Sequence, residues 1–337
     1  MRTRTRLAVL AAVCVVTLAA AIGYVVKSRS DQKNAEKHAA KVAQGSLASI
    51  ESHPRIVFRN TAPGASYGTV SMVSLDNPAG PRAITDTPCE RVYATPKNVV
   101  CLSSDRGFVI TYGAHMLDNN LQQTQTLPFV GIPSRARLSA DGSYAATTSF
   151  TASDSYGSVA FSTRTVITSV GGDTVGSLED FTLIHDGESI APVDRNFWGV
   201  TFARDDDTFY ATVAWSGHTW LVRGSIAQRK VVTLHEDAEC PSLSPDGKNI
   251  VYKHRGDLPR GKWRLVDYDI ASGKVTPLAE TRSVDDQAEW LDDAHVIYGL
   301  PRAGTQPEVD DVWSVPTSGS GKPKLLIPQA ASPAVVR

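Results

Sequence analysis

Short runs of strand-forming residues alternate with polar turn sequences through most of the chain. The clearest example is residues 241–254, where two apolar runs flank a Ser-Pro-Asp-Gly turn at residues 244–247. Such a turn combines a glycine for a positive φ with side chains that bond the backbone, which predicts a tight β-hairpin. Related turns recur near Asp141, Asp206 and Asp293, and helix-period segments are scarce beyond residue 55. The pattern predicts an all-β domain built from repeated hairpins.

The hairpin turns are regularly spaced. They centre near Pro96, Asp141, Asp206, Asp246 and Asp293, at spacings of 45, 65, 40 and 47 residues. Most spacings match the roughly 40 to 50 residues of a four-stranded propeller blade. We attribute the long spacing to polar insertions at residues 151–157 and 171–193, which we interpret as loops on one face of the domain.

The two ends of the repeat region predict how the ring closes. Five hairpins alone would leave unpaired sheet edges, which favour aggregation. Residues 331–336 look like the innermost strand of a blade whose other strands are residues 55–58, 68–75 and 81–85. Pairing residues 331–336 with residues 55–58 would close a six-bladed β-propeller over residues 54–337. Tryptophans recur in the third strands of this repeat, at Trp220, Trp263 and Trp313. We expect them to be buried between sheets, and we expect Trp198 to be in the core as well.

The N-terminal segment predicts a membrane anchor. Residues 7–26 form an uncharged apolar run, long enough to span a bilayer as a helix, and Arg2, Arg4 and Arg6 precede it. The positive-inside rule then places residues 1–6 in the cytoplasm and the rest of the chain outside the cell membrane. A signal peptide cleaved near residues 19–21 is the alternative, but the apolar run continues past that site.

Residues 27–53 are expected to form an extracytoplasmic spacer or a short helical stalk. They are rich in Lys, Ala, Gln and Glu, with few large apolar residues. His53 precedes a proline, which favours extended backbone, so we place the boundary of the propeller domain at residues 53 and 54.

Composition narrows the classes of partner. The chain has 337 residues, of which 42% are hydrophobic, so it can bury a sizeable core. Its 34 Lys and Arg nearly balance its 35 Asp and Glu, for a formal charge of -1. No global field favours a nucleic-acid partner.

The turn motifs resemble the repeats of the TolB-like propeller family. The residues that carry the resemblance are Ser244 to Lys248 with the apolar strand that follows, and Ser139 to Gly142. The resemblance covers residues 54–337 and implies a cell-envelope protein that binds other envelope proteins without catalysis. The chain departs from the family by having a membrane segment and a spacer in place of a small N-terminal domain, so the partner's identity does not carry over.

Two kinds of motif in the chain resemble catalytic or metal-binding sequences. Residues 64–68 match the G-x-S-x-G nucleophile elbow, but a strand is expected to follow instead of the required helix, so a glycine-rich hairpin loop is the better interpretation. The aspartates at 205–207 and 292–293 lie at hairpin turns, where capping of backbone amides is favoured over calcium binding.

The cysteines suggest one disulfide and no metal site. Cys89 and Cys101 flank one hairpin of an exported domain, so a bridge is reasonable, although counting from the turn places Cys101 opposite Val92. Whether Cys89 and Cys101 form a disulfide therefore remains open. Cys14 lies in the apolar segment and Cys240 is left over. No zinc-like spacing and no cofactor motif is present, so neither a metal nor a cofactor is expected.

Charged residues gather where the innermost strands are expected to begin. In a propeller these strand starts meet at one mouth of the central channel. The predicted set is Glu90, Arg91, Arg135, Arg137, Arg195, Glu239, Asp285, Asp286, Gln287 and Glu289. Such a ring can bind an ion or a peptide end, or it can be a self-compensating salt-bridge network; both interpretations remain open.

Three functional hypotheses follow. The first is a non-enzymatic, membrane-anchored platform that binds an envelope protein or a cell-wall glycan or peptide. The second is an exported carbohydrate- or lactone-cleaving enzyme with its site at the channel mouth; scattered histidines such as His115, His235 and His295 argue against it. The third is a ligand sensor, which the short segment before the membrane run makes difficult to support.

Overall fold

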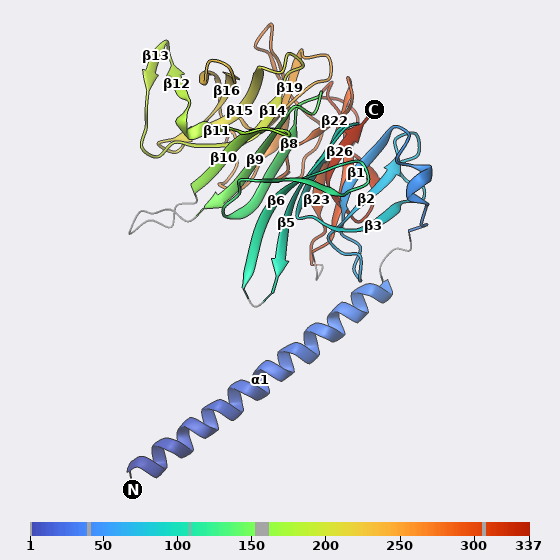
Figure 1. Ribbon diagram of the computed structural model, residues 1–337, viewed down its shortest axis with the longest axis vertical. Coiled ribbons are helices and arrows are strands. Elements are labelled where there is room, and N and C mark those ends of the chain that lie inside the picture. The colour runs from blue at the N-terminus through green and yellow to red at the C-terminus, as the bar shows by residue number, and fades with distance from the viewer. Residues whose placement is uncertain (1, 39–41, 108, 152–161, 305–307) are drawn as a thin grey trace.

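The chain folds into a six-bladed β-propeller preceded by one long helix (Figure 1). The computed structural model describes residues 2–38, 42–107, 109–151, 162–304 and 308–337. Six mainly antiparallel sheets surround a central channel, and each is a blade whose innermost strand lines that channel. The predicted fold class is confirmed.

Blades 1 to 3 use the first half of the propeller sequence together with the last strand of the chain. Listed from the channel outward, blade 1 contains β26 (Ala330–Val336), β1 (Arg55–Asn60), β2 (Thr69–Ser74) and β3 (Ala83–Pro88). Blade 2 contains β4 (Arg91–Ala94), β5 (Val99–Arg106), β6 (Ile110–Leu117) and β7 (Gln123–Leu127). Blade 3 contains β8 (Ile132–Leu138), β9 (Tyr144–Thr151), β10 (Ser162–Ser169) and β11 (Thr174–Ser177).

Blades 4 to 6 follow in chain order. Blade 4 contains β14 (Asn196–Phe202), β15 (Thr208–Trp215), β16 (His218–Ser225) and β17 (Lys230–Glu236), extended outward by β12 (Thr182–His185) and β13 (Glu188–Ile190). Blade 5 contains β18 (Glu239–Leu243), β19 (Asn249–His254), β20 (Arg264–Asp269) and β21 (Val275–Pro277). Blade 6 contains β22 (Glu289–Asp292), β23 (His295–Pro301), β24 (Asp310–Pro316) and β25 (Lys324–Ile327).

The ring closes as the sequence predicts. β26 pairs antiparallel with β1, so that Val335 lies opposite Ile56 and Ala334 lies opposite Val57. These side chains are buried, and they join the cores on either side of blade 1. Closure therefore removes the unpaired inner edge of β1.

The repeated turn owes its shape to hydrogen bonds that its own side chains make. Ser244 Oγ donates to Asp246 Oδ1 at 2.7 Å and accepts from the Asn249 backbone amide at 2.9 Å, while Gly247 has a φ of 75°. The turn between β8 and β9 repeats this geometry. There burial opposes ionisation of Asp141, but hydrogen bonds from Ser143 and Ser139 lower its pKa to about 2.

The insertion at residues 171–193 is not a set of loops, and this corrects the sequence-based interpretation. It contains β11, the short 3₁₀ helix η2 (Leu178–Asp180) and the hairpin β12–β13, which projects from blade 4 in Figure 1. Leu183 of β12 is buried and pairs in parallel with Val231 of β17. Asp186 and Gly187 both have positive φ, as in a two-residue hairpin turn. Of the other insertion, residues 152–157 lie outside the described residues.

The N-terminal helix α1 (Arg2–His38) contains a segment, Ala8–Asp31, long and apolar enough to cross a membrane. The helix continues past the predicted span and takes up the first part of the predicted spacer. The second part is docked on blade 1: the Gly45 amide donates to the Arg82 carbonyl at 2.8 Å, and Ile50, next to the 3₁₀ helix η1 (Leu47–Ser49), is buried. Contacts with the propeller thus begin before the predicted boundary at His53.

The tryptophans expected in the core are only half-buried. Trp220 stacks on Trp215, with ring centroids 5.5 Å apart. Trp263 and Trp313 instead lie under cations, and Trp198 is half-buried as well. Trp220 and Trp313 pack against the outside of buried clusters, whose own aromatic residues include Phe209 and Tyr298.

Cys89 and Cys101 form a disulfide with a Cα–Cα distance of 5.5 Å. Cys101 lies opposite Val92, as counting from the turn predicts, and Cys89 reaches it from the connection that precedes β4. Of the other cysteines, Cys14 is exposed on α1 and Cys240 is buried.

Candidate functional site

The central channel opens into a cavity at each end. We call the end where the six innermost strands begin the strand-start mouth; its cavity measures about 660 Å³. The opposite end is the strand-end mouth, where the Ser-Pro-Asp-Gly turn and Arg337 line a cavity of about 470 Å³. The two cavities are candidate binding sites because most ligand sites are concave.

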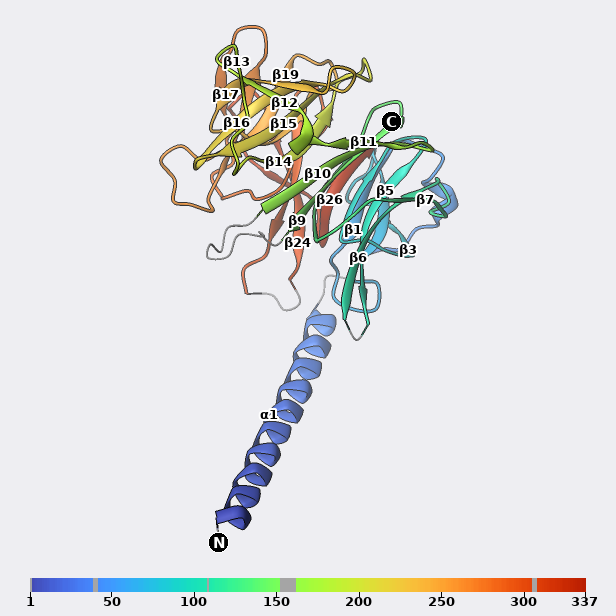
Figure 2. The ribbon, with the colours of Figure 1, turned by 60° about the vertical axis from the view of Figure 1, so that its left-hand side comes forward.

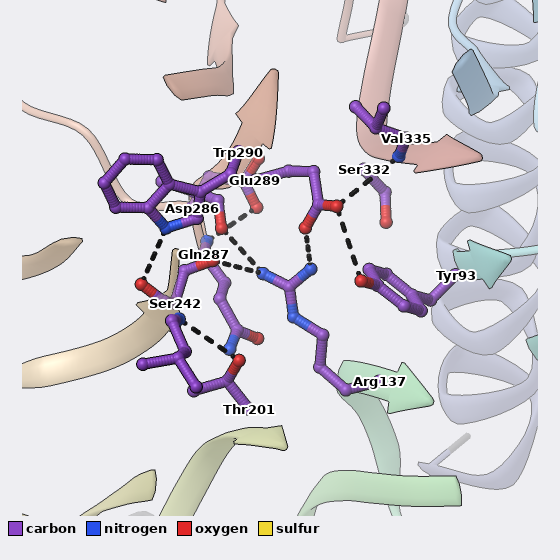
Figure 3. A network of polar contacts seen from close by, with 12 residues as sticks. Tyr93, Arg137, Thr201, Ser242, Asp286, Gln287, Glu289, Trp290, Ser332 and Val335 are labelled. Atoms are coloured by element: carbon purple, nitrogen blue, oxygen red, sulfur yellow. Dashed lines mark hydrogen bonds and ion pairs between the residues drawn. The ribbon is translucent and has the colours of Figure 1, made fainter. Parts of the chain in front are cut away.

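Figure 3 shows a buried polar cluster whose central members line the strand-end cavity. Arg137 of blade 3 forms an ion pair with Glu289 of blade 6, and donates to the Ala288 carbonyl at 2.6 Å. Its guanidinium lies 4.6 Å from the ring centroid of Tyr93, whose hydroxyl donates to Glu289 at 3.3 Å. Burial and the Glu289 carboxylate raise the pKa of Tyr93. We call Tyr93, Arg137 and Glu289 the channel plug.

Neighbouring polar side chains hold the plug in place. Gln287 donates to the carbonyls of Pro241 at 2.7 Å and Val200 at 3.1 Å, which ties blade 6 to blades 4 and 5. The Trp290 indole donates to the Ser242 carbonyl at 2.9 Å (Figure 3). With the plug residues and Val335, whose amide donates to Glu289, residues from all six blades meet at the axis.

A second layer of charges lies between the plug and the strand-start mouth. Lys253, which is buried, donates to Asp285 at 2.7 Å, and its ammonium lies 4.1 Å from the ring centroid of Trp263. The Trp263 indole donates to Glu239 at 2.7 Å, and Arg135 lies 3.6 Å from Asp285. Burial opposes ionisation of Asp285, but Lys253 and Arg135 bring its pKa below the usual value.

The rim of the strand-start cavity carries further charges. Glu90 bonds Arg59 and Arg106, each at 3.1 Å, so its charge is compensated. Glu308 and Asp310 also line the cavity but form no ion pair among the described residues. Burial, followed by the nearby Glu308 and Asp286 charges, raises the pKa of Asp310 to about 6. Arg91 and Arg59 act in the opposite direction but do not offset this rise in pKa. The rim therefore contains one partly desolvated acidic position with no direct ion pair among the described residues.

The structure separates the predicted mouth residues into three groups. Glu90, Arg91, Asp285 and Asp286 line the strand-start cavity, and Arg91 lies 3.8 Å from Asp286. The remaining central residues lie deeper, in the second layer or at the plug; they are Arg135, Arg137, Glu239, Gln287 and Glu289.

Arg195 is not part of the ring, which corrects the prediction for that residue. Its guanidinium donates to the Glu179 carbonyl at 2.7 and 3.1 Å and to the Pro192 carbonyl at 3.0 Å. It lies on the connection from the β12–β13 hairpin, so the insertion carries it away from the channel. The sequence analysis placed Arg195 near the axis because it directly precedes an expected innermost strand.

The sequence also gave no reason to select several residues of the site. Arg59 and Arg106 lie near the ends of the second strands β1 and β5. Glu308 precedes the third strand β24, and Asp310 begins it. Tyr93 projects inward from the middle of an innermost strand. The signal that would have found them is blade geometry: the turns between second and third strands face the same mouth as the starts of the innermost strands.

The turn motifs have structural roles. Ser66 of the G-x-S-x-G match lies in a turn followed by β2, and its oxygens accept from the Asn60 amide. No helix follows, so the nucleophile elbow is excluded. Asp205 and Asp292 accept from backbone amides of their own turns, as the capping interpretation predicts.

Comparisons with known proteins identify the fold. The chain is similar to TolB from Acinetobacter baumannii at 17% identity, over 84% of this chain and 67% of that one, with a TM-score of 0.61. It is similar to a chain of the nidogen/laminin complex at 10% identity, over 84% and 98% of the two chains, with a TM-score of 0.55. A puromycin-hydrolyzing peptidase of Mycobacterium tuberculosis matches at 13% identity and a TM-score of 0.49, with 82% and 44% covered, which is too distant to support an argument.

No family model and no curated protein matches the chain. Identities this low show a shared fold and nothing about chemistry. The chain is a six-bladed β-propeller similar in fold to TolB, and its function has to be argued from its own two channel mouths.

Proposed function

We propose that the chain is a membrane-anchored, non-catalytic binding module of the cell envelope, whose strand-start mouth binds a cationic group. The supporting observation is the acidic position formed by Glu308 and Asp310 in a cavity of about 660 Å³. A ligand ammonium or guanidinium there would provide a direct ion-pair partner and favour ionisation of Asp310. An amino group on an envelope protein or on a cell-wall peptide fits this requirement.

The anchor supports an extracytoplasmic location. Arg2, Arg4 and Arg6 precede the apolar segment, whereas Lys27 and Arg29 are accompanied by Asp31 beyond it. This bias supports a cytoplasmic N-terminus and a propeller outside the membrane. The Cys89–Cys101 disulfide suits an oxidising compartment.

Photocross-linking in intact cells tests this function. A photoreactive residue at Lys262, which lines the strand-start cavity, should capture one envelope partner in stoichiometric amount. The same residue at the exposed Leu325, on the outer strand β25, is the matched control and should capture none. Asp310→Asn should reduce capture at Lys262 about tenfold, since it removes the charge that the ligand needs. Equal capture at both positions would contradict the proposal.

A second candidate function rests on the same carboxylates. Asp310, with its pKa near 6, shares the cavity with Asp286, and glycoside-cleaving enzymes use a pair of carboxyl groups of which one has a raised pKa. No histidine is present among the described residues that line either cavity. Turnover of glycosides or lactones by the purified full chain, lost in both Asp310→Asn and Asp286→Asn, would favour the enzyme over the binding module.

A further inference from the structure

An apolar patch lies on the propeller surface beside the strand-start mouth. It consists of five exposed side chains from blades 2 and 3, with exposed fractions from 37 to 69%: Val109, Ile110, Val130, Ile132 and Phe150. Outside α1, the other exposed large apolar side chains of the described residues are Val193, Val232, Leu234 and Leu325. Clustering of this kind marks an interaction surface, whereas isolated exposed apolar residues do not.

Local structure brings the five side chains to one end of the two blades. Val109 and Ile110 lie at the turn between β5 and β6, whose eight-residue strands extend well beyond the four residues of β4. Ile132 pairs with Phe150 across β8 and β9, and the Ser149 hydroxyl donates to the Val130 carbonyl at 2.6 Å.

Both parts of the patch border the same cavity. Arg106, at the end of β5, and Pro133, which follows Ile132, line the strand-start mouth together. The five apolar side chains therefore form part of the rim on one side of that mouth.

The patch lies on the same side of the propeller as α1. Figures 1 and 2, which differ by a 60° turn, both show the β5–β6 hairpin pointing toward the side on which the helix lies. The tether between them is short. From Asp31 to His38 the helix rises roughly 10 Å. The five residues from His38 to the docked Ala43 span at most about 17 Å.

We propose that the apolar patch inserts into the surface of the bilayer that α1 crosses. This inference rests on the membrane anchoring in the proposed function. The short tether keeps the strand-start face within reach of the lipid, and a protruding hairpin tip with two adjacent aliphatic residues suits shallow insertion. The strand-start mouth then opens along the membrane surface, where it meets juxtamembrane segments of other proteins.

Depth-dependent quenching tests the proposal on the full chain in lipid vesicles. An environment-sensitive fluorophore is attached at Ile110→Cys or Val130→Cys in a Cys14→Ser background, because the remaining cysteines are buried or bridged. Lipids that carry a quencher near the headgroup should quench both labels several-fold more than a label at Leu325→Cys. Both labels should also emit at shorter wavelength than the Leu325 label.

The outcomes are distinguishable. A chain that alkaline carbonate extracts from the vesicles would disprove anchoring, and with it both the proposed function and this inference. An anchored chain whose labels at residues 110 and 130 are quenched no more than the label at 325 would overturn the inference alone. A blue shift without lipid quenching, growing with protein density, would assign the patch to a second copy of the chain and also overturn it.

Discussion

Substitutions in the channel plug should strongly lower the stability of the fold. In Arg137→Met the cation is lost, while Glu289, whose side chain is 9% exposed, stays buried at the axis. Glu289 would keep only the Tyr93 hydroxyl at 3.3 Å and the long contact with the Val335 amide at 3.5 Å. Removing one partner of a buried pair costs about 3–5 kcal/mol, so we expect the free energy of unfolding to fall by about that amount.

Urea unfolding of the full chain in detergent, followed by tryptophan fluorescence, measures the loss. Replacing both partners, as Arg137→Met with Glu289→Leu, should recover most of it, because an apolar pair of similar volume needs no charge compensation. Arg204→Met, at an exposed position on the strand-end rim, is the matched control and should change stability by less than about 0.5 kcal/mol. A loss below about 1 kcal/mol in Arg137→Met, or a double variant no more stable than the single one, would refute the reasoning.

Three further predictions concern other parts of the molecule. The pKa of Asp310 is raised to about 6 in the folded chain, so protonation of this residue favours folding. The free energy of unfolding should therefore rise by about 1–2 kcal/mol from this residue as pH falls from about 7 to about 4. Asp310→Asn should abolish that part of the pH dependence of the urea midpoint. Reduction of the Cys89–Cys101 bridge, which spans 12 residues of sequence, should cost about 2–3 kcal/mol, measured as a lower urea midpoint with reductant; an unchanged midpoint would count against it. Gly199→Ala should destabilise the fold by more than about 3 kcal/mol in the same assay, because its Cβ would lie 2.6 Å from a backbone atom of β18. Gly273→Ala, at a position with a similar positive φ but open space, is the control and should cost about 1 kcal/mol. Equal losses in the two variants would contradict the predicted clash.

The fold could be predicted because its determinants are local and repeated. Each Ser-Pro-Asp-Gly type of turn fixes one hairpin through bonds within a few residues, and the spacing of the hairpins fixes the number of blades. Closure by residues 331–336 followed from the need to pair a free edge. The hairpin at β12–β13 was missed although the sequence contains its Asp186-Gly187 turn, because the polar composition around it was taken as evidence for loops.

The site could be predicted only in part. Glu90, Arg91, Asp285 and Asp286 were found because the starts of the innermost strands can be located from the repeat. The depth of these residues in the channel and their ion-pair partners could not be predicted, since both depend on how the blades are arranged around the axis. Asp310 is the first residue of β24, an element that no local pattern connects to the channel, and its raised pKa arises mainly from burial, which only the assembled ring produces.

The closing strand also constrains when the propeller can form. β26 comes last in chain order, yet β1 and β2 of the same blade are the first strands after α1. In a chain exported as proposed above, blade 1 would keep the inner edge of β1 open until the whole propeller sequence has been translocated. A stalled export intermediate would therefore present that edge to quality-control proteases and to other unfinished chains.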